Sequence, residues 1–540
     1  MFKRLGAVLT LAFASLVWAE TQQANLTVYT RTGTFIGGYN DTYPDVRHFK
    51  YIPYAKPPVG IRRWASPEAL DDSTEVIDST VFGPSCVQYV SAVPSVWAMN
   101  ITGNLIVNYG ESLLAGEFAQ NSAEDCLTLA IWTPANATAG SKLPVIHFFT
   151  GGGDVTGGIN IPTQIPANWV HRSQSHIVVT TNYRVNIFSN PHARGLHNHT
   201  NFAMQDQRVA IEWVAENIAA FGGDPSRITI WGQSAGSGMV DTYLSTYYDD
   251  PIAAGAIMSS AFAIGYPAMT ADYDGLNFTF VAKSLGCDFS DPKVELECMR
   301  RIPPARIENF VGQYQDNSSL VDTTQSAIKF TRQSKIYLRA SAIPCSQLFP
   351  LVDNKYVWTN YTKRHLEGKY AKIPTIFGTT AREFSALLPY EEDGPSEELI
   401  TEDTLIFVCG GYNTTKLLNQ ANLTTYRYEW AGNFSNIAPV PWLGAYHYSD
   451  LYMFFGTYLI APGEITDLEI QTAETMQDYF LDFISDPSSM SNKWPAYDVY
   501  AANGGNITQF GADGKAVQIV TGDSVEGACH IPGATYNTTP

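Results

Sequence analysis

The sequence predicts an α/β fold, in which a central, mostly parallel sheet is flanked by helices and carries long insertions. One observation is a set of short apolar segments rich in β-branched residues, typical of buried parallel strands, at residues 128–132, 144–149, 177–181, 228–231 and 373–377. A second is a stretch of helical periodicity between two of these segments. Strand, helix and strand at this spacing indicate βαβ units, which build a parallel sheet.

The helical stretch spans residues 207–221. Its apolar side chains recur along one stripe, at Ile211, Val214, Ile218 and Phe221, and two glycines follow directly as a stop signal. We therefore expect a helix that leads into the strand at 228–231.

A single domain is expected from residue 20 to residue 540, because no repeat, low-complexity block or Pro/Ser-rich linker divides the chain. Residues 1–19 have the features of a signal peptide: Lys3 and Arg4 precede an apolar stretch from Leu5 to Leu16, and Ala19 places a small residue at the expected cleavage site. This stretch is shorter than the roughly 20 apolar residues of a membrane span, and no later stretch is long enough. The expectation is a secreted, extracellular protein without a membrane span.

The composition is that of a globular protein, with 45% hydrophobic and 16% charged residues and a formal net charge of −19. No run or stripe of Lys and Arg is present. A nucleic-acid partner is therefore not expected.

Acceptor sites for N-glycosylation are spread along the whole chain, which suits an extracellular surface. The thirteen Asn-x-Ser/Thr sites are Asn25, Asn40, Asn100, Asn136, Asn198, Asn277, Asn317, Asn360, Asn413, Asn422, Asn433, Asn506 and Asn537.

Seven cysteines in a secreted chain imply disulfides and one odd thiol. Cys287 and Cys298 are close enough to close a small loop, and Cys86 and Cys126 could close a larger one. Two of the other three would pair, and their spacing leaves open which: Cys345, Cys409 and Cys529.

The pattern Gly-x-Ser-x-Gly occurs at residues 232–236, with Ser234 at its centre. The pattern alone would fit an ordinary serine in a glycine-rich turn. Here a predicted strand ends directly before it and a helix-compatible stretch follows, the context in which such a serine is a nucleophile on a strained turn. A helix that begins behind the serine directs its N–H groups and positive dipole end at the reacting carbonyl.

Three glycines at 151–153 follow the predicted strand 144–149. Without side chains, their backbone N–H groups can approach a ligand closely. Such a loop and the residue after the nucleophile supply the donors for an oxyanion, so we assign Gly152, Gly153 and Ala235 to this role. The alternative for the loop alone is a flexible connection.

The base and the acid of a triad should follow the nucleophile in the order acid, then histidine. Of the histidines after Ser234, His365 lies in a charged, exposed-looking segment and His530 lies beside a cysteine near the C-terminus, whereas His447 has an aromatic setting that could exclude water. For the acid, Glu383 follows the strand 373–377, and the residues alone do not exclude the nearby Glu391.

These motifs resemble those of the type-B carboxylesterases, the cholinesterase-like family. Residues 221–236, Phe-Gly-Gly-Asp-Pro-Ser-Arg-Ile-Thr-Ile-Trp-Gly-Gln-Ser-Ala-Gly, are similar to the family's serine signature. Residues 124–134 resemble its second signature, and residues 52–60 its N-terminal motif. The resemblance covers most of the mature chain and looks closest to secreted fungal members.

The resemblance implies an α/β-hydrolase fold, a Ser–Glu–His triad at Ser234, Glu383 and His447, no cofactor and no metal. It also implies disulfides between Cys86 and Cys126, between Cys287 and Cys298, and between Cys409 and Cys529, so that Cys345 is the odd thiol. Buried structural ion pairs are implied for Arg63 with Glu124 and for Arg184 with Asp206.

The chain departs from the family pattern at four positions, Ala130, Thr150, Asp154 and Phe384. Thr150 and Asp154 flank the three glycines, where the family often has His and Phe, and Phe384 replaces the glycine that usually follows the acid. We expect the Asp154 carboxylate to point away from the oxyanion or to contact a polar group of the substrate. None of these departures removes a triad group.

The sequence thus predicts a secreted serine esterase whose partner is a small-molecule ester. A lipase, a lactonase or a choline-ester hydrolase would use the same triad, and for choline esters Trp97 offers an aromatic face. A non-catalytic binding protein on the same fold is disfavoured because all three triad residues are present. Nothing in the sequence indicates an oligomeric state.

Overall fold

The computed structural model describes residues 26–101, 115–197, 200–264, 275–323, 350–490 and 493–536. The predicted signal peptide lies outside these residues. So do Cys345 and three of the predicted glycosylation sites: Asn25, Asn198 and Asn537.

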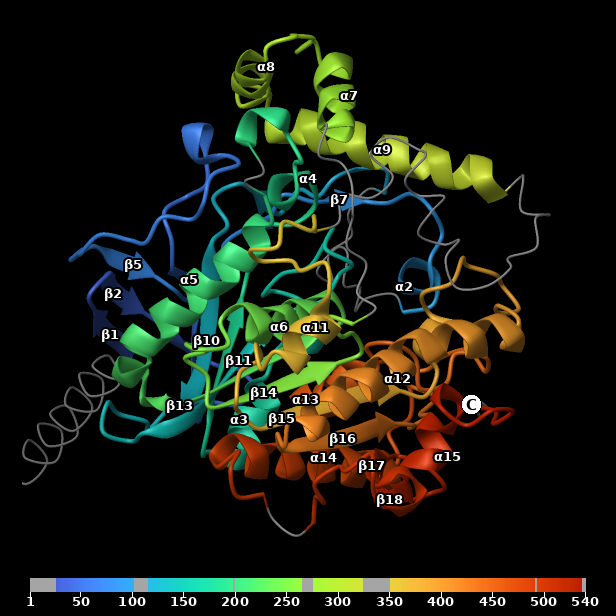
Figure 1. The fold of residues 1–540 in the computed structure, drawn as a ribbon. Coiled ribbons are helices and arrows are strands. Elements are labelled where there is room, and N and C mark those ends of the chain that lie inside the picture. The colour runs from blue at the N-terminus through green and yellow to red at the C-terminus, as the bar shows by residue number, and fades with distance from the viewer. Residues whose placement is uncertain are drawn as a thin grey trace, which may run out of the picture.

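One sheet of eleven strands runs through the described part of the chain, and it is drawn in Figure 1. Its strands, in spatial order, are β18 (Val517–Thr521), β17 (Asn506–Phe510), β16 (Thr425–Trp430), β15 (Thr375–Thr380), β14 (Gly255–Ser259), β13 (Gly223–Gln233), β11 (Leu143–Phe149), β12 (Ile177–Thr181), β10 (Thr128–Pro134), β4 (Val46–Pro53) and β3 (Gly38–Tyr39). The seven strands from β17 to β12 pair in parallel, and the strands at both edges pair antiparallel.

All five predicted strand segments are strands of this sheet, and the mostly parallel arrangement is confirmed. The prediction was wrong in one respect, because the segment 128–132 lies in β10, which runs antiparallel to both β12 and β4. Every residue of β10 is buried. Its apolar run therefore reports burial on both faces and carries no information about strand direction.

Three smaller sheets lie outside the main one among the described residues. They pair β1 (Thr27–Thr30) with β2 (Gly33–Ile36) and β5 (Val76–Asp78), β6 (Ser85–Cys86) with β9 (Ser122–Ala123), and β7 (Tyr89–Val90) with β8 (Glu117–Phe118).

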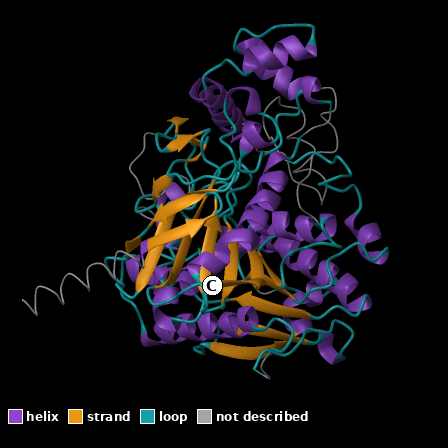
Figure 2. Cartoon of the chain, turned by 90° about the vertical axis from the view of Figure 1, so that its left-hand side faces the viewer, coloured by secondary structure: helices purple, strands orange, loops and turns teal. Residues whose placement is uncertain are grey.

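Helices cover both faces of the main sheet, as Figure 2 shows. The α-helices are α2 (Val96–Met99), α3 (Ala167–Ser173), α4 (Asn186–Ser189), α5 (Phe202–Asn217), α6 (Ala235–Thr246), α7 (Leu276–Ser284), α8 (Pro292–Met299), α9 (Pro304–Thr323), α11 (Tyr361–Leu366), α12 (Glu397–Gln420), α13 (Asp450–Phe455), α14 (Asp467–Ser485) and α15 (Gly522–Glu526). The 3₁₀ turns are η1 (Gly60–Arg62), η2 (Pro162–Gln164), η3 (Arg194–Leu196), η4 (Ile218–Phe221), η5 (Glu383–Ser385), η6 (Thr457–Ile460), η7 (Ala502–Gly504) and η8 (Gly527–Cys529).

The two faces of the sheet carry separate apolar cores, because successive strand side chains point to opposite sides. On β11, Val145 and Phe149 belong to the core that α5 and α6 cover, whereas Ile146 and Phe148 belong to the core that α3, α13 and α14 cover. The predicted helix 207–221 corresponds to α5 and the 3₁₀ turn η4, which ends at Gly222 with a φ of 101°.

Covalent and ionic links occur where the family resemblance implied them. Disulfides join Cys86 to Cys126, Cys287 to Cys298, and Cys409 to Cys529. Buried ion pairs join Arg63 to Glu124 and Arg184 to Asp206.

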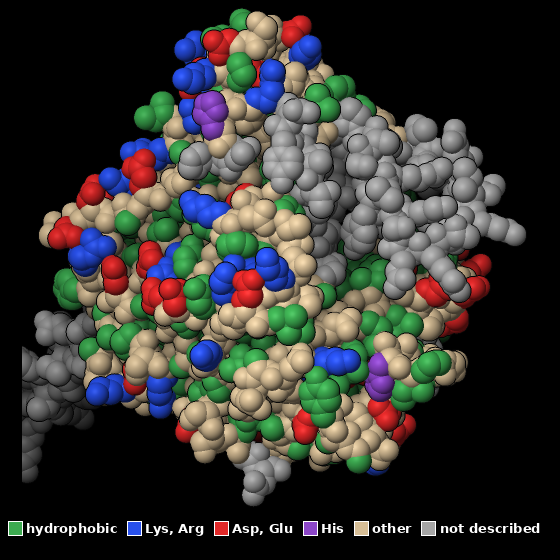
Figure 3. Space-filling model, viewed as in Figure 1, with side chains coloured by type: hydrophobic (Ala, Val, Ile, Leu, Met, Phe, Trp, Pro, Cys, Tyr) green, Lys and Arg blue, Asp and Glu red, His purple; other side chains and the backbone are tan. Residues whose placement is uncertain are grey.

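Charged side chains of both signs lie on the surface of the described chain, as in the exposed ion pair of Arg31 and Asp72. On the face drawn in Figure 3, Lys and Arg side chains lie among Asp and Glu side chains. The ten predicted glycosylation sites within the described residues are all exposed or half-buried, as carbohydrate attachment requires. A membrane-crossing helix of sufficient length and apolarity is not found in the described ranges.

Candidate active site

Ser234 lies at the turn between strand and helix that the sequence predicts. Strand β13 ends at Gln233, α6 begins at Ala235, and Ser234 between them has φ 56° and ψ −128°. This conformation is rare for a residue with a side chain, and here the surroundings enforce it. The Ser234 N–H donates to Ser259 O at 2.8 Å, and its carbonyl accepts from Ser237 N at 2.8 Å.

The flanking glycines are required by contact between backbones. A Cβ on Gly232 would lie 2.1 Å from Gly236 O, and a Cβ on Gly236 would lie 2.2 Å from Phe149 O. Both distances are far below van der Waals contact. The Gly-x-Ser-x-Gly pattern therefore lets α6 start directly against the end of β11.

Glu383 and His447 form a buried pair, although 64 positions separate them in the sequence. His447 Nδ1 lies 2.6 Å from Glu383 Oε2, and Glu383 Oε1 accepts from Thr380 N at 2.8 Å. A β-bridge between Arg382 and Tyr446 brings the two segments together. A carboxylate at Nδ1 fixes the tautomer that leaves Nε2 free to accept a proton.

The Nε2 edge of the His447 imidazole contacts the residue before Ser234. Gln233, which is fully buried, places its Nε2 3.3 Å from His447 Nε2. Within the described part of the chain no hydrogen bond joins Nε2 to the Ser234 hydroxyl. The described contact at His447 Nε2 is therefore with Gln233, the residue directly before Ser234.

The glycine loop lies against the serine. A Cβ on Gly151 would lie 2.6 Å from Ser234 Cβ, and Gly152 and Gly153 have φ values of 134° and 61° that favour glycine. A hydrogen bond holds the start of the loop, since the Tyr183 hydroxyl donates to Thr150 O at 2.5 Å. Ala235 is the first residue of α6, so its N–H is one of the helix's free donors.

Asp154, at the end of the glycine loop, is 4% exposed and has φ 61°. Its carbonyl accepts from Asn186 N at 2.6 Å, which ties the loop to α4. The expectation that its carboxylate points away from an oxyanion stays a prediction.

The other candidates for base and acid lie elsewhere. The prediction that His365 is exposed was wrong: it is buried, its Nδ1 is paired with Tyr361 O at 2.7 Å, and its ring stacks on Tyr370. His530 stacks on Tyr412 and lies 3.4 Å from Asp523. Glu391 is exposed on the surface.

Sequence reasoning missed three residues around His447: Gln233, Phe407 and Asp450. Phe407 of α12 stacks on the imidazole with a centroid distance of 5.6 Å. Asp450 is fully buried and lies 2.8 Å from the Tyr428 hydroxyl, and burial together with the nearby Glu383 carboxylate raises its pKa to about 7. Asp450 stands three residues after His447, and Gln233 lies inside the serine motif, so spacing could have drawn attention to both. No local signal marks Phe407.

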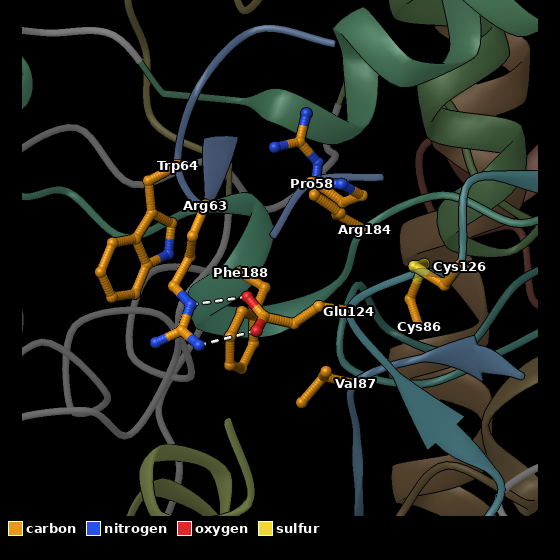
Figure 4. A pocket seen from close by; sticks show the side chains of 9 residues that line it. All are labelled: Pro58, Arg63, Trp64, Cys86, Val87, Glu124, Cys126, Arg184 and Phe188. Carbon is orange, nitrogen blue, oxygen red and sulfur yellow. Dashed lines mark hydrogen bonds and ion pairs between the residues drawn. A yellow bond between two sulfur atoms is a disulfide. The ribbon is translucent and has the colours of Figure 1, made fainter. Parts of the chain in front are cut away.

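A small pocket lies around the Arg63–Glu124 ion pair, as Figure 4 shows. Arg63 holds both Glu124 oxygens at 2.6 Å, and the Cys86–Cys126 disulfide lines the same space. None of the triad candidates lines this pocket, which agrees with a structural role for the ion pair. No group of His, Cys, Asp and Glu side chains suited to a metal ion is found among the described residues.

Comparison with known proteins identifies the family of this chain. The model of the carboxylesterase family matches residues 24–404 and 396–524. The chain is 35% identical over 555 aligned positions to secreted lipase 5 of Gibberella zeae, covering 97% of each chain. It is 36% identical over 561 positions to chlorogenic acid esterase of Aspergillus niger, covering 98% of this chain and all of the relative.

A solved structure of a PNB esterase has the same fold. It superposes with a TM-score of 0.71 at 23% identity, covering 94% of this chain and 98% of its own. A structure of a thermophilic PNB esterase gives a TM-score of 0.68 at 24% identity. These likenesses establish the α/β-hydrolase fold.

Proposed function

Because the chain belongs to the carboxylesterase family and is a carboxylic ester hydrolase, we propose that it cleaves small-molecule esters through an acyl-enzyme on Ser234. The observation that carries this proposal is the strained serine at the start of α6, together with the buried His447–Glu383 pair that contacts the preceding residue, Gln233. No cofactor enters the scheme.

In the proposed cycle, the Ser234 hydroxyl attacks the ester carbonyl while His447 Nε2 takes its proton. Glu383, paired with Nδ1, stabilises the imidazolium that forms. The N–H groups of Gly152, Gly153 and Ala235 hold the developing oxyanion, and the loss of one such donor costs about 3–4 kcal/mol of transition-state stabilisation.

His447 next protonates the leaving alcohol, and the acyl group stays on Ser234. Water then attacks the acyl-enzyme by the same route and restores the serine. The first transfer requires the Ser234 hydroxyl to replace the Gln233 amide at Nε2. We expect a rotation of the Ser234 side chain, a shift of the imidazole, or both to accompany this exchange.

The test is hydrolysis of p-nitrophenyl esters by the wild-type protein and by Ser234→Ala. We expect kcat to fall by about 10⁴-fold or more in the variant, because the residual rate comes from binding and the oxyanion donors alone. A fluorophosphonate should label the wild-type protein at Ser234 only, as read by peptide mass spectrometry.

Ser237→Ala is the matched control. Ser237 lies in the first turn of α6, the helix that begins directly after Ser234, and its hydroxyl donates a hydrogen bond to Ala261 O. This variant should keep its activity and its labelling. Undiminished hydrolysis by folded Ser234→Ala would rule out Ser234 as the nucleophile, and an inactive wild-type protein would favour a binding function on this fold.

A lipase is the second candidate, because one relative is a secreted lipase. Preference for long acyl chains and activation at an oil–water interface would favour a lipase, whereas preference for short chains would favour an esterase. For choline esters the structure offers less support, since Trp97 packs against Tyr446 and Tyr448 at centroid distances of 5.7 and 5.6 Å.

We further propose that the protein acts outside the cell as a glycoprotein, after removal of residues 1–19, and that residues 20–540 form one domain. The three disulfides, the accessible glycosylation sites and the relative named as secreted support the location. The single eleven-stranded sheet supports one domain.

A further inference from the structure

One phenylalanine ring stacks on the imidazole of His447, and a second phenylalanine ring packs against the first. Phe407, on α12, stacks on the imidazole with a centroid distance of 5.6 Å and an interplanar angle of 27°. Phe384, directly after Glu383, meets Phe407 at 5.2 Å and 40°. We call Phe384 and Phe407 the aromatic pair. Together with His447 they form a row of three packed rings.

The aromatic pair differs from the phenylalanines of the core. Core residues such as Phe149 and Phe377 are fully buried, whereas Phe384 and Phe407 are only half-buried. Neither ring packs into the apolar clusters that the described residues form. Ring surface that stays accessible beside a reacting group is available to a ligand.

Hydrogen bonds hold the segment that carries Phe384 in place. Phe384 N donates to the hydroxyl of Thr404, a fully buried residue of α12, at 3.3 Å. The neighbouring Glu383 is held by Thr380 N and by His447. The backbone that carries Phe384 is therefore held in place before a ligand binds, which lowers the ordering cost of binding.

We infer that Phe384 and Phe407 form a subsite for an aromatic ring of the ester, so that the protein prefers aromatic esters to saturated esters of the same size. This inference rests on the proposed function, because the aromatic pair lies beside the reacting bond only if Ser234 and His447 perform the reaction. A flat ring packs offset or edge-on against two aromatic rings, and a puckered cyclohexyl ring gains less from the same contact.

The experiment compares kcat/KM within two pairs of esters that differ only in the ring. Benzyl acetate and cyclohexylmethyl acetate carry the ring on the alcohol side, and methyl phenylacetate and methyl cyclohexylacetate carry it on the acid side. The leaving alcohols within each pair are similarly basic or identical, so the ratio within a pair reports on recognition of the ring. Wild type, Phe407→Leu and Phe384→Leu are measured, each after its fold has been checked by circular dichroism.

We expect the ratio of aromatic to saturated ester to fall by roughly 2- to 12-fold in each variant, for the pair whose ring occupies the subsite. Phe310→Leu is the control, since Phe310 is a half-buried ring of α9 that packs on Phe280 and Tyr314, and it should leave both ratios unchanged. The pair that responds assigns the subsite to the acid side or to the alcohol side.

The use of ratios separates this inference from its alternatives. If the aromatic pair only holds His447 in place, the leucine variants will lose activity equally on aromatic and saturated esters, and the inference is overturned. Unchanged ratios in both pairs overturn it as well. Hydrolysis of these esters that survives Ser234→Ala would instead refute the proposed function.

Discussion

Glu308 is a buried carboxyl on α9 that supports the glycine loop through one intermediate residue. Its Oε1 accepts from Asn186 Nδ2 at 2.8 Å, and Asn186 N donates to the carbonyl of Asp154. Glu308 Oε2 has no hydrogen-bond partner within the described residues. Burial raises the pKa of Glu308 to about 8, so the carboxyl keeps its proton where an exposed glutamate has lost it.

The raised pKa of Glu308 predicts a pH-dependent cost to stability. Between the ordinary value of 4.5 and about 8, the folded protein binds this proton and the unfolded chain does not, so the free energy of unfolding falls as pH rises through this interval. Glu308→Gln removes the titration and keeps the acceptor for Asn186. We expect the variant to gain stability relative to wild type by up to about 1.4 kcal/mol for each pH unit above 4.5, until about pH 8.

Unfolding by denaturant at pH 5, 6.5 and 8 measures this difference. Glu398→Gln, which neutralises an exposed glutamate on α12, is the control and should follow the wild-type curve. A constant difference between Glu308→Gln and wild type at the three pH values would show that Glu308 does not titrate in this way.

The contact of strand β11 with helix α6 sets the geometry of the nucleophile. The two elements approach until Gly236 touches the carbonyls of Phe149 and Thr150, so that a Cβ would lie 2.2 and 2.7 Å from these oxygens. Ser234 and the glycine loop are attached to the same two elements. Their distance from one another therefore depends on how closely the helix meets the strand.

Gly236→Ala is expected to separate these elements. Overpacking of this kind typically costs about 1–3 kcal/mol of stability, and a displacement of about 1 Å can cost roughly 100-fold in rate. We expect kcat to fall at least 10-fold, together with a lower melting temperature.

Gly140→Ala is the matched control, since the nearest atom to its added Cβ would be 3.9 Å away and its φ is not in the left-handed region. It should change neither quantity. Full activity of Gly236→Ala would mean that the helix can shift without moving Ser234.

Across the whole molecule, the disulfides close loops of very different length. Cys409 on α12 and Cys529 in η8 are 120 residues apart, whereas Cys287 and Cys298 are 11 apart. In the chain-entropy model, a cross-link restricts the unfolded chain more when the loop it closes is longer. The Cys409–Cys529 bond therefore contributes more to stability in this model, about 5 kcal/mol against about 3 kcal/mol.

We expect the double variant Cys409→Ser/Cys529→Ser to melt at a lower temperature than Cys287→Ser/Cys298→Ser, with the reduced wild type lower than either. Differential scanning calorimetry under one set of conditions measures the three midpoints. Equal losses from the two double variants would show that loop length does not govern the effect here.

Local features of this protein could be predicted from the sequence because they depend on neighbouring residues. The turn at Ser234 requires glycines on both sides and follows an apolar strand, and both requirements are visible within ten positions. The helix before it shows its apolar stripe and its stop at Gly222 in the same way. Chain order, and the setting of each histidine, led to His447.

Features that depend on which segments meet could not be predicted in this way. Apolarity marked 128–132 as a buried strand but could not show that β10 runs antiparallel, since burial on both faces looks the same in either direction. His365 lies among charged residues yet is buried, because its ring stacks on Tyr370.

The sequence by itself determined the sheet-and-helix architecture, the strained serine turn and the candidates for the triad, since each follows from the periodicity or backbone preference of consecutive residues. Only the tertiary structure decided that Glu383 lies on His447, that Gln233 meets Nε2, and that Phe407 stacks on the imidazole. These contacts join segments from β13, η5, α12 and the loop before α13. They exist because the folded sheet brings the ends of its strands to one edge, where packing selects neighbours without regard to their distance along the chain.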